Sequence, residues 1–299
     1  MKLLITGSTG LIGSELVRSL EASGHEVTRI VRSGAEGAPG QVLWDPSKGE
    51  LPLPGLEGMD AAVHLAGENI ASGRWTAEKK ERIRRSRVDG TRVLSESLAR
   101  LEKPPRTLIS ASAVGYYGDR GDTVLREDSP PGAGFLAEVC RDWEAAAAPA
   151  ARRGIRVVYL RFGVVLSEKG GALAQMLPTF RKGGGGRLGG GRQYVSWISL
   201  EDAVGVVGHA LSVEEVHGPV NAVAPEPVTN RDLTKTLGTV LGRPTILFVP
   251  AFVLRAMFGS MADEVLLAST RAEPAKLLAA GYRFRHPRLE EALRSLLGK

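Results

Sequence analysis

The strand, turn and helix signals in the first 33 residues constrain the fold of this chain most strongly. An apolar run at residues 3–5 meets glycines spaced G-x-x-G-x-x-G at positions 7, 10 and 13, and a helical pattern then continues to Gly24. A second β-rich run follows at residues 27–31. Glycine is needed at such a turn because a side chain would keep a pyrophosphate away from the backbone N–H groups that open the helix. The order strand, glycine turn, helix, strand therefore predicts a dinucleotide-binding unit.

The end of the second predicted strand indicates which dinucleotide is bound. Proteins that bind NAD usually carry Asp or Glu about 20 residues after the glycines, where the acid holds the ribose 2′-hydroxyl. This chain has Arg32 and Ser33 there instead. Arginine can pair with the 2′-phosphate of NADP(H), and serine can donate a hydrogen bond to it. We therefore predict NADP(H) as the cofactor, with a solvated Arg32 at the strand end as the alternative.

The composition is that of a globular protein, with 43% hydrophobic and 24% charged residues. A single cysteine, Cys140, excludes an internal disulfide and suits a reducing compartment. No apolar run reaches membrane-spanning length, and the first strand begins too early for a signal peptide, so we expect a cytoplasmic protein. The five histidines have no metal-ligand spacing, so no metal site is predicted.

The net charge of +6 would permit a nucleic-acid partner, but the charge is dispersed. Its one dense run, residues 79–87, has a helical pattern, and a solvated helix face explains it better than a nucleic-acid surface. The same charges argue against a mainly apolar helix interface between subunits. We therefore expect a small-molecule substrate, no nucleic-acid or membrane partner, and a monomer or weak homodimer.

Strand and helix patterns alternate through the first half of the chain and predict an α/β fold, a doubly wound parallel sheet of the Rossmann type with right-handed crossovers. Expected strands after the first unit lie at 41–44, 61–65, 107–111 and 155–160, and expected helices at 77–100 and 135–153. The second half begins with two helix-like turns and a glycine-rich cleft loop within 168–192. A strand at 193–199, a helix at 200–211 with a Ser199-x-x-Asp202 start, and an edge strand at 221–223 should follow. The remaining helices are expected at 230–241, 251–258, 262–269, 274–280 and 289–297.

Four segments together resemble the short-chain dehydrogenase/reductase superfamily, on its extended, NAD-dependent epimerase/dehydratase-like side. They are the glycine turn at 7–13, His64-Leu-Ala-Gly67, residues 109–118 and Arg161-Phe-Gly-Val-Val-Leu166. More narrowly, residues 67–70, Trp143-Glu144, residues 194–202 and the tail at 269–284 resemble the atypical, YfcH-like "epimerase family proteins". That group carries a small C-terminal domain of its own.

The resemblance implies a division of the chain and a set of cofactor residues. Residues 1–166 and 193–225 are expected to form the NADP(H)-binding Rossmann domain. Residues 167–192 and 226–299 would form a mostly helical substrate-side lobe, with the small C-terminal domain at about 245–297. The implied cofactor-binding residues are Gly7, Ser8, Thr9, Gly10, Leu11, Ile12, Gly13, Arg32, Ser33, Leu65, Ala66, Gly67, Arg87, Ser110, Ala111, Arg161, Phe162, Gly163, Val164 and Val165.

The chain departs from the superfamily at the Tyr-x-x-x-Lys pair, which exchanges a proton with the substrate as hydride moves. None of its five tyrosines has lysine four residues on. Alignment on Trp143-Glu144 places Leu136 in the tyrosine position and Cys140 in the lysine position. Neither side chain can run that relay, and Cys140 is better explained as a core residue than as a nucleophile.

Other groups are therefore candidates for the chemistry. Ser112 matches the superfamily's catalytic Ser/Thr, although a structural serine at a strand end is equally possible. Tyr116 and Glu68 are further catalytic candidates, with a packed loop aromatic as the alternative for Tyr116. Asn69, Gln193 and Trp197 are candidates for the substrate pocket, and an aromatic strand in the core is the alternative for the last two.

These observations leave two main functions open. The first is an NADP(H)-binding oxidoreductase or epimerase with a non-standard acid/base group, acting on a substrate that the residues do not identify. The second is a non-catalytic NADP(H)-binding sensor or scaffold, favoured by the missing tyrosine and lysine. A nucleic-acid binder rests on net charge alone.

Overall fold

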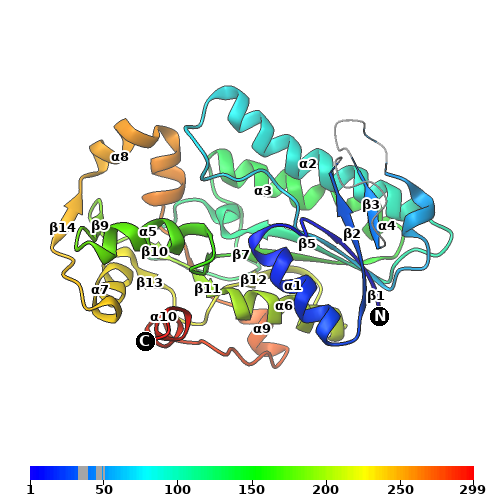
Figure 1. Cartoon of the computed structure of the whole chain (residues 1–299). Coiled ribbons are helices and arrows are strands. Elements are labelled where there is room, and N and C mark those ends of the chain that lie inside the picture. The colour runs from blue at the N-terminus through cyan, green and yellow to red at the C-terminus, as the bar shows by residue number, and fades with distance from the viewer. Residues whose placement is uncertain (33–39, 45–48, 50) are drawn as a thin grey trace.

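A parallel sheet of seven strands forms the centre of the computed structural model, which describes residues 1–32, 40–44, 49 and 51–299 (Figure 1). The strands run in the order β12-β7-β5-β4-β1-β2-β3, and every neighbouring pair is parallel. Their bounds are β1 (Lys2–Thr6), β2 (Glu26–Val31), β3 (Gln41–Leu43), β4 (Ala61–His64), β5 (Thr107–Ala113), β7 (Arg156–Phe162) and β12 (Gly218–Ala222). The order reverses between β1 and β4, and ligands of open parallel sheets bind at the carboxyl ends of the strands beside such a reversal. The predicted α/β fold is confirmed.

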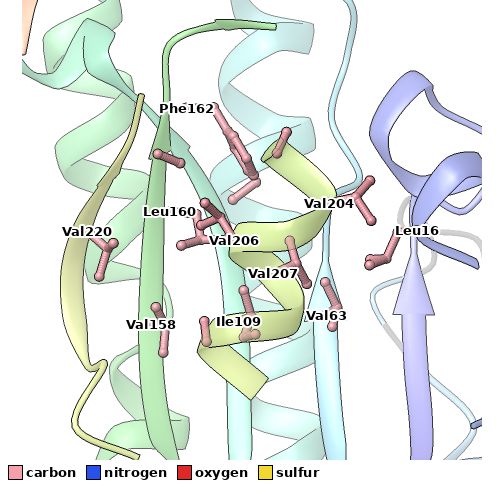
Figure 2. Close-up of a cluster of buried hydrophobic side chains, with 14 of the residues drawn as sticks. Leu16, Val63, Ile109, Val158, Leu160, Phe162, Val204, Val206, Val207 and Val220 are labelled. Atoms are coloured by element: carbon pink, nitrogen blue, oxygen red, sulfur yellow. The ribbon is translucent and has the colours of Figure 1, made fainter. Parts of the chain in front are cut away.

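Helices cover both faces of the sheet because its strands alternate their apolar side chains between the two faces. Leu3 and Ile5 pack toward α1 (Leu11–Ala22) and α6 (Leu200–Ser212), whereas Leu4 between them packs toward the other face. Figure 2 shows α6 lying across the strands, with its valine side chains directed at those of β4, β5 and β7. The opposite face carries α2 (Ala77–Arg100), α3 (Phe135–Ala145) and α4 (Ala148–Arg152) (Figure 1).

Most of the predicted helices and strands are confirmed, and two predictions are wrong. The long helix α2 has the predicted bounds, and α6 is capped by Ser199, whose side chain accepts a hydrogen bond from the Asp202 backbone N–H. The single helix predicted at 135–153 is instead two helices, α3 and α4, and Pro149 lies in the first turn of α4. In a continuous helix the proline ring would clash with the carbonyl four residues earlier, and the backbone hydrogen bond to that carbonyl would be lost. The strand predicted at 193–199 is divided into β10 (Tyr194–Val195) and β11 (Trp197–Ser199), which pair with different partners.

A smaller lobe has its own core of apolar side chains from α5 (Gly171–Arg181), β11, α7 (Asn230–Leu241) and α10 (Leu289–Leu297). The lobe is mostly helical, as predicted, and short strands distant in sequence also pair there, such as β9 (Gly186–Leu188) with β14 (Leu247–Val249). None of the helices in the described ranges has the length and apolar content needed to span a membrane. The remaining elements are η2 (Leu53–Leu56), η3 (Val114–Tyr117), β6 (Val124–Leu125), β8 (Val164–Leu166), β13 (Val228–Thr229), α8 (Ala251–Phe258), η4 (Ala262–Leu266), β15 (Arg271–Ala272) and α9 (Ala275–Ala279).

Candidate functional site

The glycine turn joins β1 to α1 at the carboxyl edge of the sheet, beside the reversal in strand order. Gly7 has a φ of +70°, and a Cβ there would lie 2.7 Å from the backbone nitrogen of Ala66. A Cβ on Gly13 would lie 2.1 Å from the carbonyl oxygen of Gly7, so the helix can approach the turn only with glycine at this position. Gly10 caps α1 and offers no side-chain hydrogen bond, which leaves the first helical N–H groups free to meet an anion. Around them Ser8 is buried, Thr9 is exposed, and Leu11 and Ile12 are half-buried.

A second loop, after β4, faces the glycine turn and is tied to the end of β1 by hydrogen bonds. The Thr6 hydroxyl lies 2.6 Å from His64 Nδ1 and accepts a hydrogen bond from the Ala66 backbone N–H. Burial lowers the pKa of His64 to about 4, so this imidazole is neutral near pH 7. Arg87 donates to the carbonyl oxygen of Glu68 over 3.0 Å and so holds this loop in place. The half-buried Leu65 and Ala66 and the exposed Gly67 thus lie where the sequence predicted one wall of the cofactor site.

The positions expected to read the 2′-phosphate lie at the end of β2. Arg32 follows the strand and is exposed, and it has no ion-pair partner in the described part of the chain. Ser33 lies outside the described residues. Arg32 is close enough to Glu68 to help lower the pKa of that carboxyl, although hydrogen bonding to Lys79 contributes most. An anionic group bound here would therefore meet an exposed arginine.

Glu68 is held as a carboxylate by its neighbours. Its Oε1 lies 2.6 Å from Lys79 Nζ and 3.7 Å from Arg82 Nε. These contacts lower the pKa of Glu68, and a carboxylate stabilised in this way is a weaker proton acceptor. The structure thus gives Glu68 a role in fixing the loop.

Ser112 belongs to a buried polar cluster at the carboxyl end of β5. Its hydroxyl donates to Glu144 Oε1 over 2.8 Å, and both Glu144 oxygens accept from Arg161, over 2.8 Å from Nε and 2.9 Å from Nη2. Arg161 also donates to the Tyr117 hydroxyl, which in turn donates to Asn221 Oδ1 over 2.7 Å. Burial by itself would lower the pKa of Arg161, but the hydrogen bonds and charge of Glu144 outweigh it and raise that pKa. Burial also raises the pKa of Tyr117 to about 12, so this phenol stays protonated.

Tyr116 lies directly over this cluster. The centre of its ring is 3.5 Å from the guanidinium carbon of Arg161, and the residue is half-buried. Of the other predicted cofactor residues, Ser110, Ala111 and Phe162 are buried, and Gly163, Val164 and Val165 are half-buried. The Arg161 side chain itself points into the cluster, so only the backbone of this residue could approach a cofactor. The sequence did not single out Glu144, Tyr117 or Asn221 as site residues, although Glu144 stands in one of the motifs that carried the resemblance.

A pocket of about 350 Å³ opens beside the cluster, between η3, the start of α3 and the C-terminal segment around η4. Leu136 lines it together with Gly115 and Gly118. The carboxylate of Glu264 forms part of the opposite wall and accepts hydrogen bonds of 2.8 Å from the backbone N–H groups of Phe135 and Leu136. The C-terminal lobe therefore both caps α3 and closes the pocket.

The three predicted substrate-pocket residues do not lie in this pocket. Trp197 has no exposed surface, because its ring belongs to the core of the smaller lobe and its indole N–H donates to the Glu226 carbonyl. The prediction that Trp197 lines the substrate pocket is therefore wrong, and the alternative of a core aromatic holds. Gln193 is buried and donates to the carbonyls of Leu188 and Leu266. Asn69 is exposed and accepts from the Ala71 N–H in a local turn.

Fold and site together define a Rossmann-type α/β protein with an uncapped glycine turn and a buried polar cluster at the carboxyl edge of its sheet. Residues 3–222 match the NAD dependent epimerase/dehydratase family, and residues 249–296 match a domain of unknown function, DUF1731. The chain belongs to the NAD dependent epimerase/dehydratase family, as the sequence motifs indicated.

Full-length relatives support this assignment. The chain is 47% identical to Epimerase family protein MT2273 of Mycobacterium tuberculosis, covering 97% of this chain and 95% of the relative. It is 38% identical to human Epimerase family protein SDR39U1, covering 99% and 100% of the two chains. The crystal structure of human SDR39U1 (isoform 2) with NADPH aligns with a TM-score of 0.90 and 36% identity, covering 100% of this chain and 99% of the human one.

Proposed function

We propose that this chain binds NADP(H) and acts as an oxidoreductase or epimerase on a small molecule held in the pocket beside α3. One juxtaposition carries the proposal: the glycine turn after β1 and the Ser112–Glu144 pair at the carboxyl end of β5 lie at the same edge of the sheet. Neither Gly7 nor Gly13 has room for a Cβ, as a turn that binds a dinucleotide requires. The exposed Arg32 fits a 2′-phosphate on that dinucleotide. The human relative that was crystallised with NADPH supports the same cofactor.

The residues of the cluster have separate roles in this proposal. NADP(H), when bound, donates or accepts a hydride. Ser112 Oγ donates to Glu144 and keeps lone pairs for a hydrogen bond from a substrate hydroxyl. In the oxidation direction the substrate hydroxyl gives its proton to Ser112 Oγ as the serine proton passes to Glu144 Oε1, and in the reduction direction both protons return by the same path to the substrate oxygen. Arg161 holds the carboxylate in position throughout. Ser112 thus takes the place of the missing tyrosine.

A second function, NADP(H) binding without turnover, is favoured by α3. Leu136 cannot transfer a proton, and burial raises the pKa of Cys140 to about 12, so this thiol keeps its proton. A protein that only senses or presents the cofactor would need neither group.

Replacing Arg32 with alanine should weaken NADPH binding roughly 10- to 100-fold and leave NADH binding unchanged. A charge-assisted contact to the 2′-phosphate is worth about 1.5–3 kcal/mol, and NADH lacks that phosphate. Isothermal titration with both cofactors measures the two affinities. The control is Arg29→Ala, which removes an equal charge from β2, the strand that Arg32 follows. Arg29 pairs with Glu21, so its loss should change the affinity for neither cofactor. Equal losses for NADPH and NADH in Arg32→Ala would contradict the role given to Arg32.

Replacing Ser112 with alanine should lower turnover roughly 100-fold, the lower range for a lost acid/base group, without changing the affinity for NADPH. The assay follows NADPH oxidation over a panel of carbonyl compounds. Ser97→Ala is the matched control, because Ser97 is also a buried serine but lies in α2 and is not among the predicted site residues. If the wild type binds NADPH tightly but oxidises it with no compound of the panel, the result supports the second function, NADP(H) binding without turnover. If Ser112→Ala is as active as the wild type, Ser112 has no part in the mechanism.

A further inference from the structure

A second pocket, of about 320 Å³, lies in the smaller lobe between α7, β9 and β14, at the end of the molecule away from β1 and β2 (Figure 1). It shares no lining residue with the pocket beside α3. Its walls are formed by Arg187, Arg231, Thr234, Lys235, Thr245, Ile246 and Leu247. Neither the cofactor site nor the proposed reaction uses these residues.

The charged lining of this pocket is entirely positive. Arg231, Thr234 and Lys235 share one face of α7, since residues three and four apart in a helix lie side by side. Arg187 reaches the same space from β9. None of the three cations has a carboxylate partner among the described residues, although 18 ion pairs occur elsewhere in them. The one acid of α7, Asp232, is bonded to the capping residue Thr229.

Two buried polar atoms at the pocket also lack hydrogen-bond partners within the described residues. Thr234 is 3% exposed, and its hydroxyl oxygen makes no hydrogen bond. Arg187 Nε is buried and equally unpaired. Leaving such groups unsatisfied is costly, and each one in a folded protein calls for an explanation. Both residues line the pocket, so an anion bound in it would lie beside two polar groups that the described residues leave unsatisfied.

The geometry around Arg187 fixes its guanidinium for such a contact. It lies 5.6 Å from the ring centre of Phe248, on β14. A Cβ on Gly191 would lie 3.1 Å from Arg187 Cδ and 3.3 Å from Arg231 Cβ, so a glycine at this turn lets the two arginines come close together. Two positive side chains held near each other without an acid between them repel unless an anion intervenes.

We propose that this pocket binds the phosphate group of an organic phosphate. Two guanidinium groups, an ammonium and a hydroxyl suit a dianion that accepts several hydrogen bonds, and arginine matches phosphate geometry with paired N–H donors. The volume lies at the lower end of small-molecule sites and exceeds what a bare phosphate needs. Ile246, which is 86% exposed, and Leu247 supply an apolar wall for the rest of the ligand.

Calorimetric titration of phenyl phosphate and of inorganic phosphate into NADPH-saturated protein tests the site, because the bound cofactor occupies the glycine turn. We expect saturable binding that weakens with added salt, with phenyl phosphate binding more tightly than inorganic phosphate. The double variant Arg231→Gln/Lys235→Gln should weaken it at least roughly tenfold, since both side chains are exposed and their loss spares the fold. Thr234→Val should weaken it several-fold while leaving stability equal or higher. The NADPH affinity should stay unchanged in all of these variants, which separates this site from the cofactor site.

The matched control is Lys182→Gln/Arg243→Gln, which removes two exposed positive charges from the same lobe outside the pocket. It should change phosphate binding less than twofold. Absence of saturable binding by the wild type, or equal weakening by both double variants, would overturn the proposal. Vesicles of phosphatidylcholine with and without phosphatidic acid identify the source of the phosphate. If the protein sediments with the phosphatidic acid vesicles and the variant Arg231→Gln/Lys235→Gln does not, the ligand is a lipid headgroup. If the protein binds phenyl phosphate but neither kind of vesicle, the ligand is a soluble phosphate ester.

Discussion

Replacing Gly13 with alanine should reduce NADPH affinity at least roughly 100-fold. The new Cβ would lie 2.1 Å from the carbonyl oxygen of Gly7, which is too close for two non-bonded heavy atoms. Helix α1 must therefore move away from the glycine turn. The N–H groups that open α1 would then miss the pyrophosphate. Two charge-assisted hydrogen bonds are worth about 3–6 kcal/mol together, which sets the size of the loss. Overpacking should also lower the free energy of unfolding by about 1–3 kcal/mol.

Gly208→Ala provides the control for the Gly13 variant. Gly208 lies in α6, and a Cβ there meets nothing within 4 Å. The substitution should therefore raise the free energy of unfolding by about 0.5–1 kcal/mol, since alanine favours a helix more than glycine does, and leave NADPH binding unchanged. Titration of NADPH and urea unfolding measure both quantities. An NADPH affinity of Gly13→Ala within tenfold of the wild type would show that the turn does not hold the pyrophosphate.

The sequence predicted the sheet and its helices because their signals are local. Helix α2 has a capping threonine, a charged outer face and two prolines after its end, and its bounds were correct. Pro149 is a local signal for the break between α3 and α4. The alanines around it favour a helix, and they led to the prediction of one continuous helix. The pairing of β9 with β14 could not be predicted, because each strand has three residues and the two lie far apart in the chain.

The candidate site shows the same division. The glycine turn was recognised because its spacing is itself the signal. Ser112 and Arg161 were identified separately, but their shared partner Glu144 lies 32 residues from Ser112 on another element, and no local pattern links them. Trp197 was misplaced because a strand with two aromatics has the same sequence pattern in a core as in a pocket. Tertiary packing, which the pattern does not contain, decides between the two.

Replacing Arg161 with methionine should lower the free energy of unfolding by about 3–5 kcal/mol, the usual cost of leaving a buried charge without its partner. Arg161 is 2% exposed, and both oxygens of Glu144 accept hydrogen bonds from it. Its loss would leave a carboxylate of 12% exposure facing only the Ser112 hydroxyl. The Tyr117 hydroxyl would also lose a donor. Urea unfolding at neutral pH measures the change.

Arg84→Met is the matched control. Arg84 also pairs with carboxylates of α3, the helix that carries Glu144, but its side chain is 33% exposed. Water screens such pairs, so the variant should lose only about 1 kcal/mol or less. In the double variant Glu144→Met/Arg161→Met no unpaired charge remains, and much of the lost stability should return. If Arg161→Met alone were within 1 kcal/mol of the wild type, the cluster would be open to water. Ser112 would then face a solvated carboxylate instead of a fixed proton acceptor.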